Sequence, residues 1–119
     1  MNKEDIVIVS ASRTPMGSFQ GNLAELKATD LGTKVIQKNL KDTGIVSTEI
    51  DEVIMGCVLP AGLGQAPARQ ASIGANIPNT VGATTINKMC GSGMKAVMMG
   101  HDSILAGSNR IVLAGGLES

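Results

Sequence analysis

The sequence predicts an α/β fold with a mostly parallel sheet and helices on both of its faces. Short apolar runs recur along the 119 residues, and segments with helical periodicity separate them. None of the runs alternates cleanly between apolar and polar residues, which is typical of strands covered on both faces. Four runs with three helices between them predict the order βαβαβαβ with right-handed crossovers. The four runs are residues 6–9, 53–55, 84–86 and 110–113.

Three segments carry the helical patterns. Residues 28–43 are apolar on one half of a helical wheel and polar on the other, which predicts a half-buried surface helix ended by Gly44. A second helix is expected from Pro67, which suits a first helical turn, to about Asn76. The third, from about 91 to 106, is apolar around nearly the whole wheel, so we expect it to be buried.

Composition excludes several classes of function. Ten basic residues balance ten acidic ones and are scattered, which argues against nucleic acid and an anionic membrane surface as partners. No apolar stretch reaches the roughly 18 residues of a membrane span, and the first residues do not resemble a secretory signal. With only Cys57 and Cys90, a disulfide framework is not expected, and the default location is the reducing cytoplasm. The length suits one domain.

Residues 87–94 lie where a predicted strand turns into the third helix. A cysteine at a helix start faces unpaired backbone N–H groups and the positive end of the helix dipole, which favour a thiolate. The glycines on either side of Ser92 permit a sharp turn. A thioester attacked by Cys90 would place its oxyanion against N–H groups of this turn. From position alone, a small buried hydrophobe is an equally good interpretation of Cys90.

The segment 86–97, Ile-Asn-Lys-Met-Cys-Gly-Ser-Gly-Met-Lys-Ala-Val, resembles the signature around the acyl-accepting cysteine of thiolases at essentially every position. Segments 10–21, 62–70 and 114–119 also resemble thiolases, in the same order, so the resemblance covers the whole chain. The Met-Cys-Gly-Ser-Gly-Met form is similar to the acetyl-CoA acetyltransferase group rather than to the long-chain degradative group.

The resemblance implies a fold, a reaction and a nucleophile. It implies a thiolase-like half-domain in which Cys90 accepts an acetyl group from acetyl-CoA and passes it to a second acetyl-CoA. The products are acetoacetyl-CoA and CoA, and the reverse is thiolytic cleavage in fatty acid metabolism. The backbone N–H of Cys90 would form part of an oxyanion hole. No metal and no permanently bound cofactor are implied, and the residues that bind CoA stay unassigned.

In thiolases a histidine, a second cysteine and an asparagine–histidine pair complete the site from the carboxy-terminal half, and a loop domain binds most of CoA. Residues 1–119 are therefore expected to be the amino-terminal domain, without the loop and carboxy-terminal domains, and to be inactive as a thiolase on their own. Two alternatives remain: a ketoacyl synthase relative that uses carrier-protein thioesters, and a catalytically inert fragment that needs the missing half.

The other candidate residues have structural interpretations. His101 follows Cys90 by eleven residues on one helix, roughly 16 Å farther along, so it is interpreted as a helix-end cation. Cys57 has no metal-ligand spacing around it and is expected in the core. Lys88 and Lys95 flank Cys90, and solvated charges are favoured over an effect on the thiol.

Arg69 and Gln70 stand at the start of the second helix, where structural capping is favoured. The sequence assigns no partner to Glu118. The resemblance also implies that strand 83–89 lies at a sheet edge and pairs antiparallel with a second copy, giving a homodimer or tetramer. Thr84-Thr85-Ile86 carries no charge or proline that would block such pairing.

Overall fold

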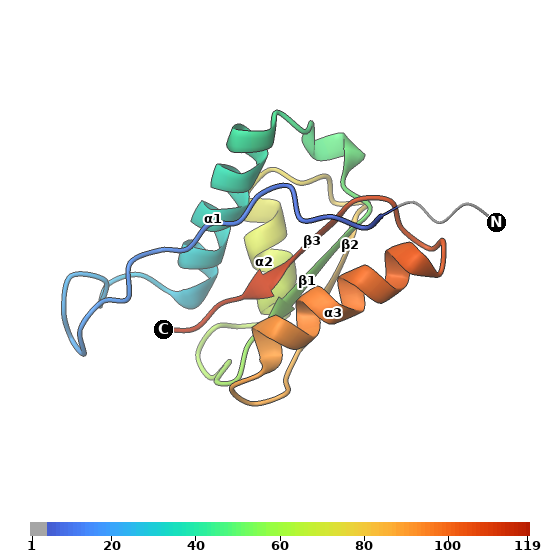
Figure 1. The fold of residues 1–119 in the computed structure, drawn as a ribbon. Coiled ribbons are helices and arrows are strands. Elements are labelled where there is room, and N and C mark those ends of the chain that lie inside the picture. Colours follow the sequence, from blue (N-terminus) through green and yellow to red (C-terminus); the bar gives the residue numbers. More distant parts are fainter. Residues whose placement is uncertain (1–4) are drawn as a thin grey trace.

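The computed structural model describes residues 5–119, which form a three-stranded parallel sheet with helices on both faces (Figure 1). Along the chain the elements are α1 (Ala28–Thr43), the 3-10 helix η1 (Ser47–Glu49), β1 (Glu52–Gly56), α2 (Pro67–Gly74), β2 (Gly82–Ile86), α3 (Ser92–Leu105) and β3 (Val112–Gly116). The strand order is β2-β1-β3, so β1 is central and β2 is an edge. The predicted α/β class and its parallel sheet are confirmed.

The two faces of β1 face different layers. Val53, Met55 and Cys57 belong to the buried core with α1 and α2. Because side chains alternate along a strand, Gly56 faces the opposite layer. A Cβ added at Gly56 would come within 2.5 Å of Ser92, so β1 and the start of α3 are in direct contact there. The sheet thus separates an α1/α2 layer from an α3 layer, as Figure 1 shows.

The register brings the carboxyl ends of all three strands to one edge of the sheet. Gly56 is level with Ile86 on β2 and with Gly116 on β3. The segments that follow the strands therefore begin side by side, and ligand sites of open parallel sheets are found at such edges. Cys57, the turn that contains Cys90, and Glu118 all lie beyond this edge.

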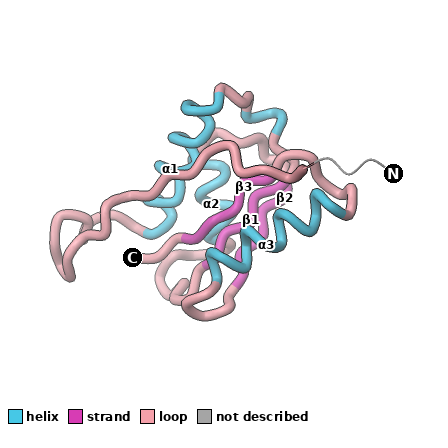
Figure 2. Tube along the Cα trace, viewed as in Figure 1, coloured by secondary structure: helices cyan, strands magenta, loops and turns pink. Residues whose placement is uncertain are grey.

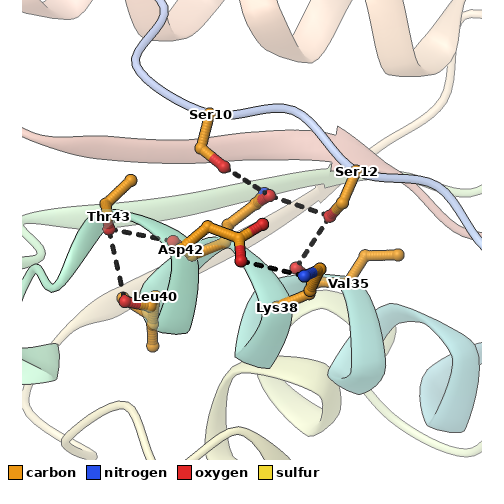
Figure 3. Close-up of polar contacts among 8 residues, drawn as sticks. Ser10, Ser12, Val35, Lys38, Leu40, Asp42 and Thr43 are labelled. Carbon is orange, nitrogen blue, oxygen red and sulfur yellow. Dashed lines mark hydrogen bonds and ion pairs between the residues drawn. The ribbon is translucent and has the colours of Figure 1, made fainter.

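The predicted strand at residues 6–9 is wrong. This segment has no ladder to any strand and runs as a loop, and the chain that follows it passes over α1 (Figure 2). The Ser10 and Ser12 hydroxyls donate to Asn39 Oδ1 at 3.0 and 2.8 Å, which ties the chain to α1 (Figure 3). A β-branched run becomes a strand only where a strand edge offers it backbone partners, and residues 6–9 make no backbone hydrogen bond to any strand among residues 5–119.

Helix α3 is not buried all round, contrary to the prediction. Ala96 and Gly100 are buried against the sheet, whereas Met94 and Met98 are 74% and 52% exposed. The helix packs with one side on β1 and β3, and no layer of residues 5–119 covers its other side. The boundaries of the other helices agree better: α1 ends at the left-handed Gly44, and α2 begins at Pro67.

Candidate nucleophile site

Cys90 lies in the tight turn that joins β2 to α3, and its thiol is exposed. The N–H of Gly91 donates to the carbonyl of Lys88 at 3.1 Å, and the N–H of Ser92 donates to that of Met89 at 3.1 Å. Gly91 is the N-cap of α3, so Cys90 stands just before the helix rather than at its first position, where the sequence placed it. In this position the side chain is open to a substrate.

The residue before Cys90 has an unusual backbone conformation. Met89 has a φ of 51°, in the left-handed region that costs a non-glycine residue on the order of 1–3 kcal/mol. Its N–H donates to Asn87 Oδ1 at 2.9 Å, and its carbonyl accepts from the Ser92 hydroxyl at 2.6 Å. Hydrogen bonds therefore hold both sides of the strained residue.

Ser92 closes the turn from inside the protein. Its side chain is buried, and its Oγ accepts the Lys88 N–H at 2.8 Å while it donates to Met89. The contact between Ser92 and Gly56 places this hydroxyl directly over the central strand. The turn is thus fixed to the sheet through a side chain that the sequence analysis did not single out.

The turn carries backbone N–H groups that are free to donate hydrogen bonds. The backbone N–H groups of Cys90 and Gly93 meet no acceptor among residues 5–119. Unpaired N–H groups at a helix start favour negative charge. An oxyanion that develops on a carbonyl attacked by the Cys90 sulfur is a charge of the kind that such groups stabilise.

Cys57 lies at the same sheet edge in a different environment. It is 2% exposed, and its Sγ is 3.9 Å from Glu118 Oε1. Burial raises the pKa of the Cys57 thiol, and the negative Glu118 carboxylate raises it further. Cys57 is therefore a neutral core residue, as the sequence predicted.

Glu118 and Asn87 connect the segments that follow the three strands. The Glu118 carboxylate accepts the N–H groups of Val58 and Leu59 at 2.9 and 2.8 Å. Asn87 donates from Nδ2 to the carbonyl of Val58 at 3.3 Å. Sequence patterns assigned no partner to Glu118 and no role to Asn87, although asparagine after a strand is a common turn former.

The side chains of the remaining candidates form no hydrogen bond or ion pair with Cys90 within residues 5–119. His101 is in the second half of α3, with Nδ1 3.0 Å from Asp102 Oδ1, so it is not a base for Cys90. Within residues 5–119, Lys88 and Lys95 form no ion pair.

Around α2, Gln70 Nε2 donates to the carbonyls of Leu63 and Gln65 at 2.6 and 2.7 Å, which supports its structural interpretation. Arg69 donates to the carbonyl of Asn79 at 3.5 Å, a contact within the same region of the fold.

The described residues 5–119 contain no group of three side chains suited to a metal ion, and none of their helices is long and apolar enough to cross a bilayer. A hollow of ≈ 630 Å³ lies beside the loop at residues 13–20 and α1, and Cys90 is not among the residues that line it.

Comparison with known proteins agrees with this geometry. Residues 6–119 match the sequence model of the thiolase N-terminal domain. Acetyl-CoA acetyltransferase 2 of Arabidopsis thaliana is 53% identical over 119 residues, 100% of this chain and 30% of the relative. The acetyl-CoA acetyltransferase of Cupriavidus necator is 54% identical over 115 residues, 97% of this chain and 29% of the relative.

Among solved structures, the Acat5 thiolase from Ascaris suum in complex with coenzyme A is similar with a TM-score of 0.86 and 46% identity, over 90% of this chain and 28% of that one. The chain spans about 30% of the length of the curated relatives it matches. It belongs to the thiolase family, and the part of the family that it matches is the N-terminal domain.

Proposed function

We propose that Cys90 is the acyl-accepting nucleophile of an acetyl-CoA acetyltransferase. The observation that carries this proposal is the exposed thiol at a strained turn, next to unpaired N–H groups, in the N-terminal domain of a thiolase. A thiol in this position is open to a thioester, whereas the thiol of Cys57 is buried. The names of the relatives and the coenzyme A in the Ascaris structure support CoA thioesters as substrates.

The reaction would proceed in two halves. The Cys90 sulfur attacks the carbonyl carbon of acetyl-CoA, the bond between that carbon and the CoA sulfur breaks, and CoA leaves as its thiol. A second acetyl-CoA then loses a proton from its α-carbon. The resulting carbanion attacks the carbonyl carbon of the acetyl group on Cys90, and the bond between that carbon and the cysteine sulfur breaks. The product is acetoacetyl-CoA, and the reverse sequence is thiolytic cleavage.

In this proposal the turn also stabilises the developing oxyanion. The backbone N–H of Cys90 is the donor that we assign to it, because it meets no acceptor among residues 5–119 and belongs to the residue that carries the thiol. Removing one such donor from an enzyme typically lowers the rate by about 100-fold to 1000-fold. No permanently bound cofactor is needed for this chemistry.

We propose that residues 1–119 form the amino-terminal domain of the enzyme and that proton transfer is done by residues outside it. His101, the single histidine of the chain, lies too far along α3. We also propose a homodimer or tetramer that assembles through the β2 edge. A cytoplasmic location and a role in fatty acid metabolism stay predictions, and the related rat enzyme is named mitochondrial.

Release of CoA tests the nucleophile. When the protein as its gene encodes it is mixed with excess acetyl-CoA, we expect about one equivalent of free thiol per active site in a rapid first phase. Cys57→Ser should keep this phase and Cys90→Ser should lose it. A first phase that survives in Cys90→Ser would contradict the proposal.

A further inference from the structure

We propose that Asn87 and Glu118 are positioning residues that hold the Cys90 turn through hydrogen bonds across the carboxyl ends of the three strands. This inference rests on the proposed role of Cys90 as a nucleophile. Neither side chain is placed in contact with substrate here. Their effect on the reaction would pass through the backbone of the turn.

The connection begins at Glu118, just after β3. Its two carboxylate oxygens accept one N–H each from Val58 and Leu59, at 2.9 and 2.8 Å. Charge-assisted bonds to backbone N–H groups are among the stronger hydrogen bonds in proteins. They fix the segment that follows β1 relative to the end of β3, across 59 and 60 residues of sequence.

Asn87 connects the segment after β1 to the turn that contains Cys90. The carbonyl of Val58 accepts from Asn87 Nδ2 at 3.3 Å, and Asn87 Oδ1 accepts from the Met89 N–H at 2.9 Å. The Asn87 amide therefore bonds in two directions. Its N–H donates to the segment after β1, and its oxygen accepts from the turn that contains Cys90. Aspartate in this position keeps the acceptor and loses the donor.

The target of these bonds is the strained residue next to the nucleophile. Met89 is held at a φ of 51°. The backbone conformation of Met89, its φ and ψ together, sets the direction of the peptide that carries the Cys90 N–H. Ser92 holds the same residue from the buried side. Loss of the Asn87 bond leaves one of the two restraints, so the Cys90 N–H and thiol should no longer be held together in one arrangement.

A coupled pair of substitutions tests this arrangement in the protein as its gene encodes it. The rate at which acetyl-CoA acylates Cys90 is measured for Asn87→Ala, Met89→Gly and the double variant. Asn87→Ala removes both hydrogen bonds of the amide, and we expect it to lower the rate about fivefold, because only the bond to the Met89 N–H acts directly on the turn. Glycine adopts the left-handed region freely, so Asn87→Ala should cost less than about twofold in the Met89→Gly background.

One further variant and two controls complete the set. Glu118→Gln should lower the acylation rate less than Asn87→Ala, because it keeps one acceptor oxygen. Asn22→Ala and Glu25→Gln change side chains without a hydrogen bond among residues 5–119 and should match the unchanged protein. Alkylation of the buried Cys57 reports any general loosening, and it should stay slow in every variant.

Each outcome decides the inference. Equal effects of Asn87→Ala in both backgrounds would overturn it, because Asn87 would then not act through Met89. Rapid alkylation of Cys57 in Asn87→Ala would also overturn it, since the role would be structural. If the unchanged protein is not acylated at Cys90, the proposed function itself fails. That result differs from one in which the unchanged protein is acylated and the substitutions leave the acylation rate unaltered, which would overturn only the inference.

Discussion

The two cysteines of this chain each follow a strand at the same edge of the sheet, and they have opposite environments. Cys57 comes directly after β1, its N–H donates to the carbonyl of Ile86 at 2.9 Å, and its side chain stays in the core. Cys90 comes four residues after β2, beyond the turn at Met89, and is exposed. The residue type is the same, so the turn and the distance from the strand end determine which thiol is available for chemistry.

Replacing each cysteine with serine should give the largest difference between the two sites. Cys90→Ser should lower acetyl transfer by several orders of magnitude, as loss of a catalytic nucleophile does. Cys57→Ser places a hydroxyl in the core and should lower the free energy of unfolding by about 1–3 kcal/mol, with acetyl transfer retained. Steady-state rates and urea unfolding of both variants check this, and similar losses of activity in both would contradict it.

The strands that lead to the two cysteines also differ, because β1 is central and β2 is an edge. The carbonyl of Ile86 faces β1, so by alternation the N–H of Thr85 faces the free edge. Thr85→Pro removes this donor and should convert a dimer into monomers with little activity.

The matched control for Thr85→Pro is Thr85→Val. Proline also removes Thr85 Oγ1, which accepts the N–H of Ala68 at 3.0 Å, and valine removes only that oxygen. Sedimentation velocity should show monomers for proline and dimers for valine. Dimers for both would place the interface elsewhere.

Contact between the strand end and the helix start gives a smaller effect. Gly56→Ala places a methyl group within 2.5 Å of Ser92 and should destabilise the protein by about 1–3 kcal/mol while it displaces the Cys90 turn. Gly82→Ala is the matched control, because a Cβ there meets nothing within 4 Å. Urea unfolding should separate the two, and an unchanged Gly56→Ala protein would mean that α3 shifts freely.

The pH dependence of the free energy of unfolding tests the buried environment of the Cys57 thiol. Because burial raises the pKa of this thiol in the folded protein, its contribution to stability is complete below the unfolded value of about 8.5. That contribution is lost as the pH rises through the higher folded pKa. Urea unfolding between pH 8 and 10 should show a smaller decline for Cys57→Ala, and parallel curves would contradict the assignment.

Local patterns predicted most of the fold, and contacts between distant residues account for what they missed. The amphipathic pattern of 28–43, Gly44 and Pro67 are local signals, and they located α1 and the start of α2. Residues 6–9 have the composition of a strand but pair with no strand among residues 5–119, and their own sequence does not encode whether a partner strand is beside them.

The site divides in the same way. Cys90 was predicted from its motif, and its exposed position in the turn agrees with a role in chemistry. The two Glu118 hydrogen bonds span 59 and 60 positions of the sequence, and the Asn87 bond to Val58 spans 29 positions. No local periodicity indicates contacts over such separations. The left-handed Met89 was missed because methionine rarely adopts that conformation.

Peptide mapping after a brief reaction with isotopically labelled acetyl-CoA tests the central claim most directly. The reaction is quenched in acid, which preserves thioesters, and the protein is digested and analysed by mass spectrometry. The account predicts one labelled acetyl group on the peptide that contains Cys90 and none on the peptide that contains Cys57. Label on Cys57, or on neither cysteine, would contradict it.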